Sequence, residues 1–450
     1  MKNQNIFHYK IDFFFLILFF TLPSLLYSYG YTNSISTSII VLQLFFLLIY
    51  NFIKKKKITI NIKFFSFAIL ISLIIFAHQI AIIFLSDLFF TFQNIIILKK
   101  LFFSYLSIPI YIYSIFILNE FLFKTKGIEI YFYKLINNLF MIMFLLSFFI
   151  LIRFNKFSPY YIFGANDLPM FLSIYSEPSH FITNFFAIFF LFIVLNPNYK
   201  IIILTIGLLL SLAYPSLTLL FGIFLITVIL FPILNILILL VPILIFLLLI
   251  FNLSTGFEFI NYFNDRLDVL SILNNCSPYL LLNNEDINFY QFFLENTCSI
   301  NNSLLYYFKS AHEMYLNLVH YPFGIGFQNF GFIGMESLFR KLAFLQSGIF
   351  KTDISLNSAF LLCKLISEFG ILGLLFLIYY FKMFLQSFIF LKFKAKIFLI
   401  KKEYLVIFYH TSILSFSIEL FIRGFGYFSI GSFLFILSIL GLYYKKNNEN

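Results

Sequence analysis

The sequence predicts an all-α polytopic membrane protein, because three features of the 450-residue chain agree. Hydrophobic residues make up 62% of the chain and charged residues only 11%, so a soluble domain of this length would lack polar surface. Many apolar runs approach or exceed the roughly 18–20 residues that a helix needs to cross a bilayer. Short segments that alternate polar and apolar residues are rare, so helices are expected rather than the strands of a membrane barrel.

About twelve apolar runs predict membrane-spanning helices. The first run has no clear small-x-small cleavage site and further spans follow it closely, so we interpret it as a retained span rather than a signal peptide. Pro215, between two short runs, is compatible with a tight turn, a kink or a broken helix. The predicted spans lie near 11–29, 36–53, 62–85, 101–119, 131–152, 179–195, 200–213, 217–231, 233–251, 356–381, 403–422 and 427–444.

The lysines that flank these runs predict the orientation of the spans. When the predicted spans cross the membrane one after another, most of these lysines fall on the same side of it. They are Lys54 to Lys57, Lys124, Lys126, Lys200, the lysines of 392–402, Lys445 and Lys446. By the positive-inside rule this side is cytoplasmic, and both termini lie there. Lys99 and Lys100 do not fit this orientation, because they fall in a loop that is predicted to lie outside. The net charge of +11 therefore reflects membrane topology rather than binding to nucleic acid.

The same threading places two long segments outside, at 153–178 and at 252–355. The second is roughly a hundred residues long, and loops of that length usually carry function. The sequence thus divides into an N-terminal bundle at 1–252, a large periplasmic loop at 253–355 and C-terminal helices at 356–450.

The large loop contains a predicted helix, "SLLYYFKSAHEMYLNLVH", and two cysteines, Cys276 and Cys298. In an oxidising compartment these cysteines are candidates for a disulfide that contributes about 3 kcal/mol through loop entropy. The alternative is a pair of unpaired thiols.

Arginine is rare among the thirty basic residues, and its positions are informative. The threading places all of the arginines outside or at the outer end of a span: Arg153, Arg266, Arg340 and Arg423. The planar guanidinium holds phosphate or carboxylate through two parallel hydrogen bonds, so these residues are candidate anion ligands. The alternative is that they form ordinary ion pairs in loops.

The stretch "YSEPSHF" places Glu177 and His180 where a polar segment meets an apolar run. Glu177 precedes Pro178 and suits a helix N-terminus, where a carboxylate complements the helix dipole. A carboxylate at the mouth of a membrane is also costly and is a candidate for function. His180 lies three residues further on and would share its helix face. Both are candidate catalytic groups.

A metal site and a nucleotide site are not expected in the large loop. His312 and His320 are eight residues apart, whereas a metal site prefers closer spacing and a third ligand. The glycines of "PFGIGFQNFGFIG" follow no strand and precede no Gly-Lys-Ser/Thr, so they are expected to shape a turn near the membrane surface.

Four segments together resemble the Wzy-type O-antigen polymerases, within the superfamily of polymerases and ligases that act on undecaprenyl-linked sugars. "YSEPSHF" resembles the family's Glu-Pro-Ser segment, and "HYPFGIGFQNF" its Pro-x-Gly-x-Gly-Phe segment. "SLNSAFLLCKLISEFGILGLL" resembles the re-entry helix, and "FIRGFGYFSIGSFLFIL" the entry to the last span. The related ligases usually carry a His-Asn pair at re-entry, where this chain has Ser355, Leu356 and Asn357, which favours a polymerase.

The resemblance implies a membrane fold like that of the GT-C glycosyltransferases and an enzyme of the bacterial inner membrane. Such an enzyme transfers a growing glycan from undecaprenyl diphosphate to a new lipid-linked repeat unit, without metal or other cofactor. Its partners would be the lipid-linked donor and acceptor, the bilayer, a chain-length regulator and a flippase. Glu177 and arginines such as Arg266 and Arg423 would line the catalytic cavity.

The implied chemistry agrees with the candidate residues. Arginines can neutralise a diphosphate leaving group, and Glu177, His180 or His312 can accept the proton of the acceptor hydroxyl. Two alternatives remain at this stage. An O-antigen ligase is the nearer one. A flippase or similar transporter is the other, although such proteins usually show repeated halves and charges at the membrane midplane.

Overall fold

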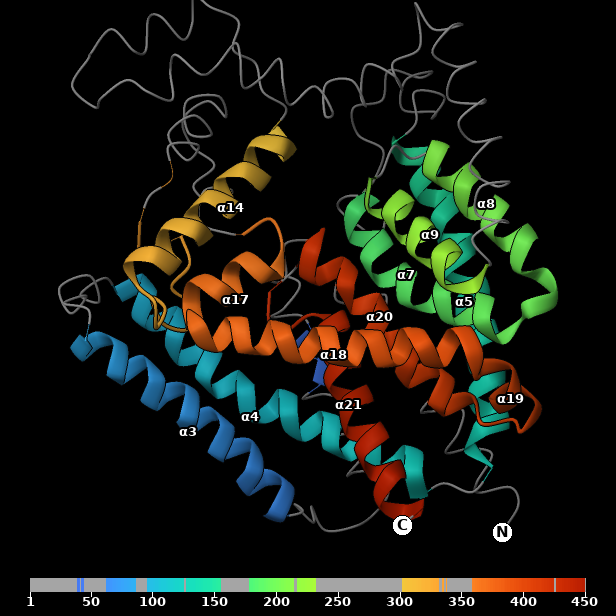
Figure 1. Cartoon of the computed structure of the whole chain (residues 1–450), viewed down its shortest axis with the longest axis horizontal. Helices are drawn as coiled ribbons and strands as arrows, with labels where there is room; N and C mark the ends of the chain where they lie inside the picture. Colours follow the sequence, from blue (N-terminus) through green and yellow to red (C-terminus); the bar gives the residue numbers. More distant parts are fainter. Residues whose placement is uncertain are drawn as a thin grey trace, which may run out of the picture. The chain divides into compact units, whose positions relative to one another are not determined.

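The computed structural model is built almost entirely of helices in the part of the chain that it describes (Figure 1). The described residues are 39–40, 42–43, 62–85, 95–124, 127–154, 178–213, 217–231, 302–331, 334–335, 337, 358–424 and 426–449. Most of the described helices coincide with a predicted apolar run, and the described part of the chain confirms the helical class.

In the N-terminal half, the helices follow the predicted spans closely. They are α3 (Ile62–Leu85), α4 (Ile95–Lys124), α5 (Ile128–Phe154), α7 (Pro178–Leu195), α8 (Lys200–Ala213) and α9 (Leu217–Leu230). Pro178 is the first residue of α7, a position where the missing N–H of proline costs no helical hydrogen bond. The predicted runs 11–29 and 233–251, and most of 36–53, lie outside the described residues.

The C-terminal half contains α14 (Asn302–His320), α17 (Leu361–Phe369), α18 (Ile371–Phe393), α19 (Ala395–Ile400), α20 (Tyr404–Phe421) and α21 (Ile430–Glu449). Helix α14 confirms the helix predicted in the large loop. The predicted span 356–381 is wrong in its bounds, because Gly370 ends α17 with a φ of 54° and α18 begins after it. Left-handed backbone of this kind is a common end for a helix and favours glycine.

Five helices in the described part of the chain are long and apolar enough to cross a membrane: 64–84, 101–120, 128–145, 371–393 and 404–421. A sixth span is counted if α7 and the following helix form one bent span, with an angle of 103° between 185–195 and 197–208. Pro197 lies at that bend, where a helix cannot continue regularly. The chain is therefore a multi-pass membrane protein, and the predicted number of about twelve spans stays a prediction.

The chain divides into two compact units. Unit 1 comprises 1–76, 102–231 and 378–450, and unit 2 comprises 77–101 and 232–377. Unit 1 thus joins helices from both ends of the sequence, because α20 packs against α5, α7, α9 and α21. Unit 2 contains α14 and α17, which pack against each other.

Aromatic side chains fill much of the interior of unit 1. The rings of Phe140 and Phe192 stack with their centroids 3.8 Å apart, and those of Phe416 and Phe435 stack at 4.5 Å. Helix α20 is buried on nearly all sides, from Leu405 to Leu420. A helix that is apolar all round is typical of the centre of a bundle, so α20 is a core element of unit 1.

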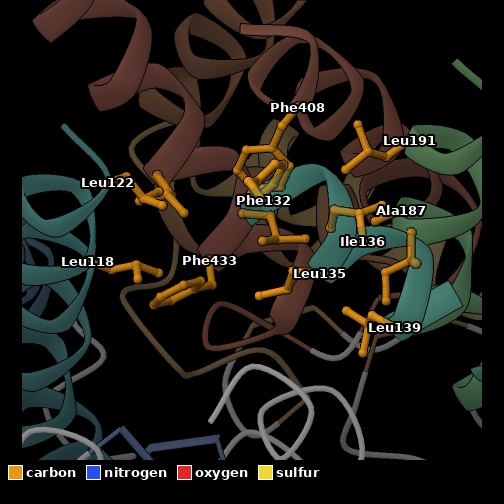
Figure 2. A pocket seen from close by; sticks show the side chains of 13 residues that line it. Leu118, Leu122, Phe132, Leu135, Ile136, Leu139, Ala187, Leu191, Phe408 and Phe433 are labelled. Carbon is orange, nitrogen blue, oxygen red and sulfur yellow. The ribbon is translucent and has the colours of Figure 1, made fainter. Parts of the chain in front are cut away.

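An apolar cavity of about 40 Å³ lies between α4, α5, α7, α20 and α21 of unit 1. Leucine, isoleucine and phenylalanine side chains, with Ala187, line it (Figure 2). Cavities lined only by such groups stay dry and offer no hydrogen bond to a polar ligand. We therefore interpret this cavity as a packing feature of the bundle.

Polar contacts fix the two ends of the α20–α21 pair. At one end, the Lys445 ammonium of α21 donates to the Glu403 carboxylate, which precedes α20. Near the same end of α20, the Leu405 N–H donates to Glu129 Oε2 of α5 at 2.8 Å. At the other end, the Gly431 N–H donates to Glu419 Oε1 at 2.9 Å. The two helices are therefore antiparallel neighbours, as the predicted threading requires. Which end faces the cytoplasm stays a prediction.

Candidate functional site: the glycine turn of unit 2

The candidate site is built around a turn of 321–331, which follows α14 and which we call the glycine turn. Gly324 and Gly326 both have a φ of 92°, and Gly331 has a φ of 82°. Residues with a side chain rarely adopt this backbone, so the glycines are needed for the path of the turn. The sequence-based expectation that these glycines shape a turn is confirmed.

The glycine turn is interlocked with the C-terminal end of α17. The Ile325 N–H donates to the carbonyl oxygen of Ser367 at 2.9 Å, and the Gly326 N–H donates to that of Glu368 at 3.0 Å. A Cβ atom at Gly324 would lie 2.3 Å from the Glu368 carbonyl oxygen. Glycine is therefore required here both for conformation and for the close approach of two backbones.

The carboxylate of Glu368 anchors this turn from within. It is completely buried and accepts the Gln328 N–H at 2.7 Å and the Phe330 N–H at 3.1 Å. Lys364, one helical turn earlier, lies 4.0 Å from Glu368 and donates to Gln328 Oε1 at 2.6 Å. Burial lowers the pKa of Lys364, and the neighbouring Glu368 carboxylate opposes this shift. A buried carboxylate and a cation thus hold the turn against α17.

A second buried ion pair lies within α14. Lys309 and Glu313 are 3.8 Å apart, and their side chains are 0% and 2% exposed. In the same helix, Ser310 Oγ accepts the Ala359 N–H at 2.9 Å, which ties α14 to the segment that leads into α17. Burial raises the pKa of the nearby Cys363 thiol, so this cysteine is a packed, unreactive side chain rather than a nucleophile.

Helix α14 also carries His312, a predicted candidate for catalysis. Its Nδ1 atom lies 2.9 Å from Ser337 Oγ, and its ring is partly buried. Burial lowers the pKa of His312 below its usual 6.5, because the imidazolium is poorly solvated there. His312 is therefore neutral at pH 7 and able to accept a proton.

Acidification is expected to destabilise unit 2 through His312. Because the folded-state pKa lies below 6.5, the unfolded chain binds the proton first, and stability falls as the pH drops from 6.5 through the folded-state value. Melting temperatures of purified protein between pH 7.5 and 5 measure this. His312→Gln should flatten the loss, whereas the control His320→Gln, at the exposed end of α14, should not. Equal pH profiles for both variants would contradict the assignment.

The other predicted site residues are placed as follows. Arg423 follows α20 in unit 1, partly buried, and its backbone N–H donates to the Ile418 carbonyl oxygen at 2.9 Å. Arg153 lies near the C-terminal end of α5 and His180 in the first turn of α7. Glu177, Arg266, Arg340, Cys276 and Cys298 lie outside the described residues.

Two polar features of the structure were missed by the sequence analysis. The Lys364–Glu368 pair lies inside a predicted span, and its spacing of four residues was the available signal. Glu419 is also buried, at 2% exposure, and accepts a hydrogen bond from the Ser429 hydroxyl at the start of α21. A carboxylate within an apolar run was the signal for Glu419. Its contacts identify it as a cap for α21.

Replacing Gly324 should be far more damaging than replacing an exposed glycine with a similar backbone. In Gly324→Ala, the added Cβ would lie 2.3 Å from the Glu368 carbonyl oxygen, a backbone atom that cannot move aside easily, at a φ of 92°. Gly127 has a φ of 76°, and no atom of the described residues lies within 4 Å of the place where its Cβ would be, so Gly127→Ala carries only the backbone cost of about 1–2 kcal/mol. Thermal melts of the two variants should show the larger loss for Gly324→Ala, and equal losses would contradict the tight packing described here.

Comparison of the chain with known protein families, with characterised proteins and with solved structures finds no match. Within the described ranges, no group of three or more histidine, cysteine, aspartate or glutamate side chains is arranged to hold a metal ion.

Proposed function

We propose that this protein polymerises undecaprenyl-diphosphate-linked repeat units into O-antigen or a related surface polysaccharide. The reaction would take place at the outer face of the bacterial inner membrane, with both termini in the cytoplasm. The enzyme would transfer the growing glycan from its lipid diphosphate to the end of a new lipid-linked unit.

One structural observation supports this proposal above others. Two of the four segments that resemble the polymerases, 320–330 and 355–375, form a single interlocked element through contacts between positions about forty residues apart. Their contacts run through the positions that carry the resemblance: the glycines of the turn, Glu368 and Gly370. A Cβ atom at Gly370 would lie 2.0 Å from the Pro322 carbonyl oxygen. The two segments therefore form one structural element, as expected of two parts of a common motif.

The leaving group of this reaction is a glycosyl diphosphate, whose charge must be stabilised as the bond to the sugar breaks. Guanidinium groups do this through paired, charge-assisted hydrogen bonds. Arg266 and Arg423 are the residues we assign to the diphosphate, and Arg153 and Arg340 are further candidates. This role follows from the resemblance and from the use of lysine, rather than arginine, at the predicted cytoplasmic side.

The acceptor hydroxyl must lose a proton as it attacks the anomeric carbon. Glu177 is the residue we assign as general base, with His180 and His312 as the other candidates. The neutral His312 has a suitable protonation state, and its contact with Ser337 Oγ fixes the orientation of the ring.

Deletion of the gene followed by gel analysis of surface glycan tests the proposal in cells. We expect lipid A core that carries single repeat units, because ligation continues while polymerisation stops. Core without any repeat unit would instead indicate a ligase or a flippase. A normal ladder of long chains would overturn the proposal.

A further inference from the structure

The short connection between α18 and α20 carries a dense group of lysines. Both helices are long and apolar enough to cross a membrane, with the bounds 371–393 and 404–421, so the residues between them lie at a membrane surface. Helix α19 occupies most of this connection and packs against α20 (Figure 1). We call residues 392–402 the basic connection, and its exposed lysines are Lys392, Lys394, Lys396, Lys401 and Lys402.

The protein does not neutralise these lysines. The basic connection contains no acidic residue, and within the described ranges none of its lysines forms an ion pair. The carboxylate that follows it, Glu403, is paired with Lys445 of α21. Glu129 of α5 accepts a backbone N–H at the start of α20. Lys446 is exposed beside Lys445, so this end of α20 and α21 carries an excess of positive charge.

Apolar side chains lie between the lysines on the outward face of α19. Ala395 is buried, and the Phe398 ring packs against that of Phe390 with centroids 4.9 Å apart, so these residues hold α19 on unit 1. Ile397 and Ile400 are three residues apart, share another face and are 51% and 74% exposed. Lysines that only set the orientation of spans need no such apolar neighbours.

Exposed isoleucines flanked by lysines are typical of a helix that lies in the membrane interface. Lys396 and Lys401 come directly before Ile397 and directly after Ile400. In such a helix the apolar side chains enter the acyl region, while the long lysine side chains keep their ammonium groups at the level of the headgroups. The basic connection thus has the side chains for both layers of the interface.

The charge and depth of these groups define the partner. A run of lysines beside a membrane span is typical of surfaces that bind anionic lipids. Zwitterionic phospholipids carry a positive group that offsets their phosphate, so anionic phospholipids are the better match. A soluble polyanion such as nucleic acid fits less well, because it would leave Ile397 and Ile400 exposed to water.

We propose that the basic connection binds the headgroups of anionic phospholipids, with Ile397 and Ile400 inserted among the acyl chains. The contact holds the adjoining ends of α18 and α20 at the membrane surface. This surface is independent of the polymerase activity proposed above, and none of the groups assigned to that activity belongs to it.

The chain contains no tryptophan, so a single introduced tryptophan reports the lipids beside it. Ile397→Trp protein would be reconstituted in vesicles of phosphatidylcholine and phosphatidylglycerol, with bromine, a fluorescence quencher, on the acyl chains of one lipid at a time. The quenching should show at least a tenfold preference for phosphatidylglycerol at this position. Each lysine near an anionic surface contributes about a fivefold factor. Adding Lys396→Gln and Lys401→Gln should therefore lower the preference at least fivefold.

Two controls separate this surface from the charge of the whole protein. Phe224→Trp places the reporter on α9, at a side chain that is 51% exposed in a helix without charged residues, and it should show little preference between the two lipids. Lys134→Gln with Lys200→Gln removes two lysines outside the basic connection and should leave the preference at Ile397→Trp unchanged.

Equal quenching by the two lipids at Ile397→Trp would overturn the proposal, and so would a preference that survives the change of Lys396 and Lys401 to glutamine. A preference as large at Phe224→Trp would show an effect of net charge alone. No quenching by either lipid would place α19 outside the membrane interface and favour a soluble partner. Should the glutamine pair fail to fold, the comparison between the two tryptophan positions decides the matter.

Discussion

Glu177→Gln and Arg266→Ala are each expected to abolish long-chain polysaccharide while protein level and single-unit glycan stay normal. Glutamine keeps the shape of the glutamate side chain but cannot act as a base near neutral pH, and general base catalysis contributes roughly 10²–10⁴ in rate. Alanine at 266 removes a bidentate contact to the diphosphate, which is worth on the order of 2–4 kcal/mol at the transition state. Gel analysis of surface glycan with a membrane immunoblot measures both quantities.

The replacement Arg266→Lys separates charge from geometry. Lysine keeps the positive charge but lacks the planar fork, so only partial recovery of polymer is expected. Arg423→Ala should behave like Arg266→Ala. A purely structural role for these residues predicts less protein in the membrane instead. Normal long chains from both Glu177→Gln and Arg266→Ala would exclude the proposed catalytic residues.

Glu368→Ala is expected to destabilise the protein severely. The substitution removes the acceptor for the Gln328 and Phe330 N–H groups and leaves Lys364 without its buried counter-charge. Breaking a buried pair in this way costs about 3–5 kcal/mol. A fall in melting temperature on the order of 10 °C should follow for the purified protein in detergent.

Glu403→Ala is the control for Glu368→Ala. The Glu403–Lys445 pair is also a glutamate with a lysine, but the two side chains are 30% and 23% exposed. Pairs open to solvent contribute about 0.2–1 kcal/mol, so this variant should melt within a few degrees of wild type. Equal losses for the two variants would show that Glu368 does not anchor the glycine turn.

The spans of this protein were predictable because their signal is local. Runs of apolar residues identify α3, α5 and α7 within a few residues, since in a membrane the backbone must satisfy its hydrogen bonds within each helix. Helix α14 was also recognised from its own sequence, and so was the turn that its following glycines form.

The break at Gly370 was not predictable from hydropathy. The residues on both sides of it are apolar, and the break exists because the Ile371 N–H donates to the Pro322 carbonyl oxygen in the glycine turn, nearly fifty residues earlier. Contacts between segments so far apart leave no periodic signal in the sequence.

The roles of the polar residues within spans were likewise hidden. The Glu419 carboxylate accepts hydrogen bonds from the Gly431 N–H and the Ser429 hydroxyl. These donors lie beside Glu419 only because α20 packs against α21. Gln79 lies in a helix whose apolar run dominates its sequence, and only the folded structure places its amide against Gly326. Sequence reasoning located the elements, and the three-dimensional contacts showed which polar side chains hold them together.

Synthesis of polymer by the purified protein tests the central claim most directly. The protein, reconstituted in lipid vesicles without any other enzyme, would be incubated with undecaprenyl-diphosphate-linked repeat units, and the products separated on a gel. A ladder that extends by one repeat unit per step, and that disappears with Arg266→Ala, is the predicted result. Repeat units that remain single in the presence of folded wild-type protein would contradict the claim.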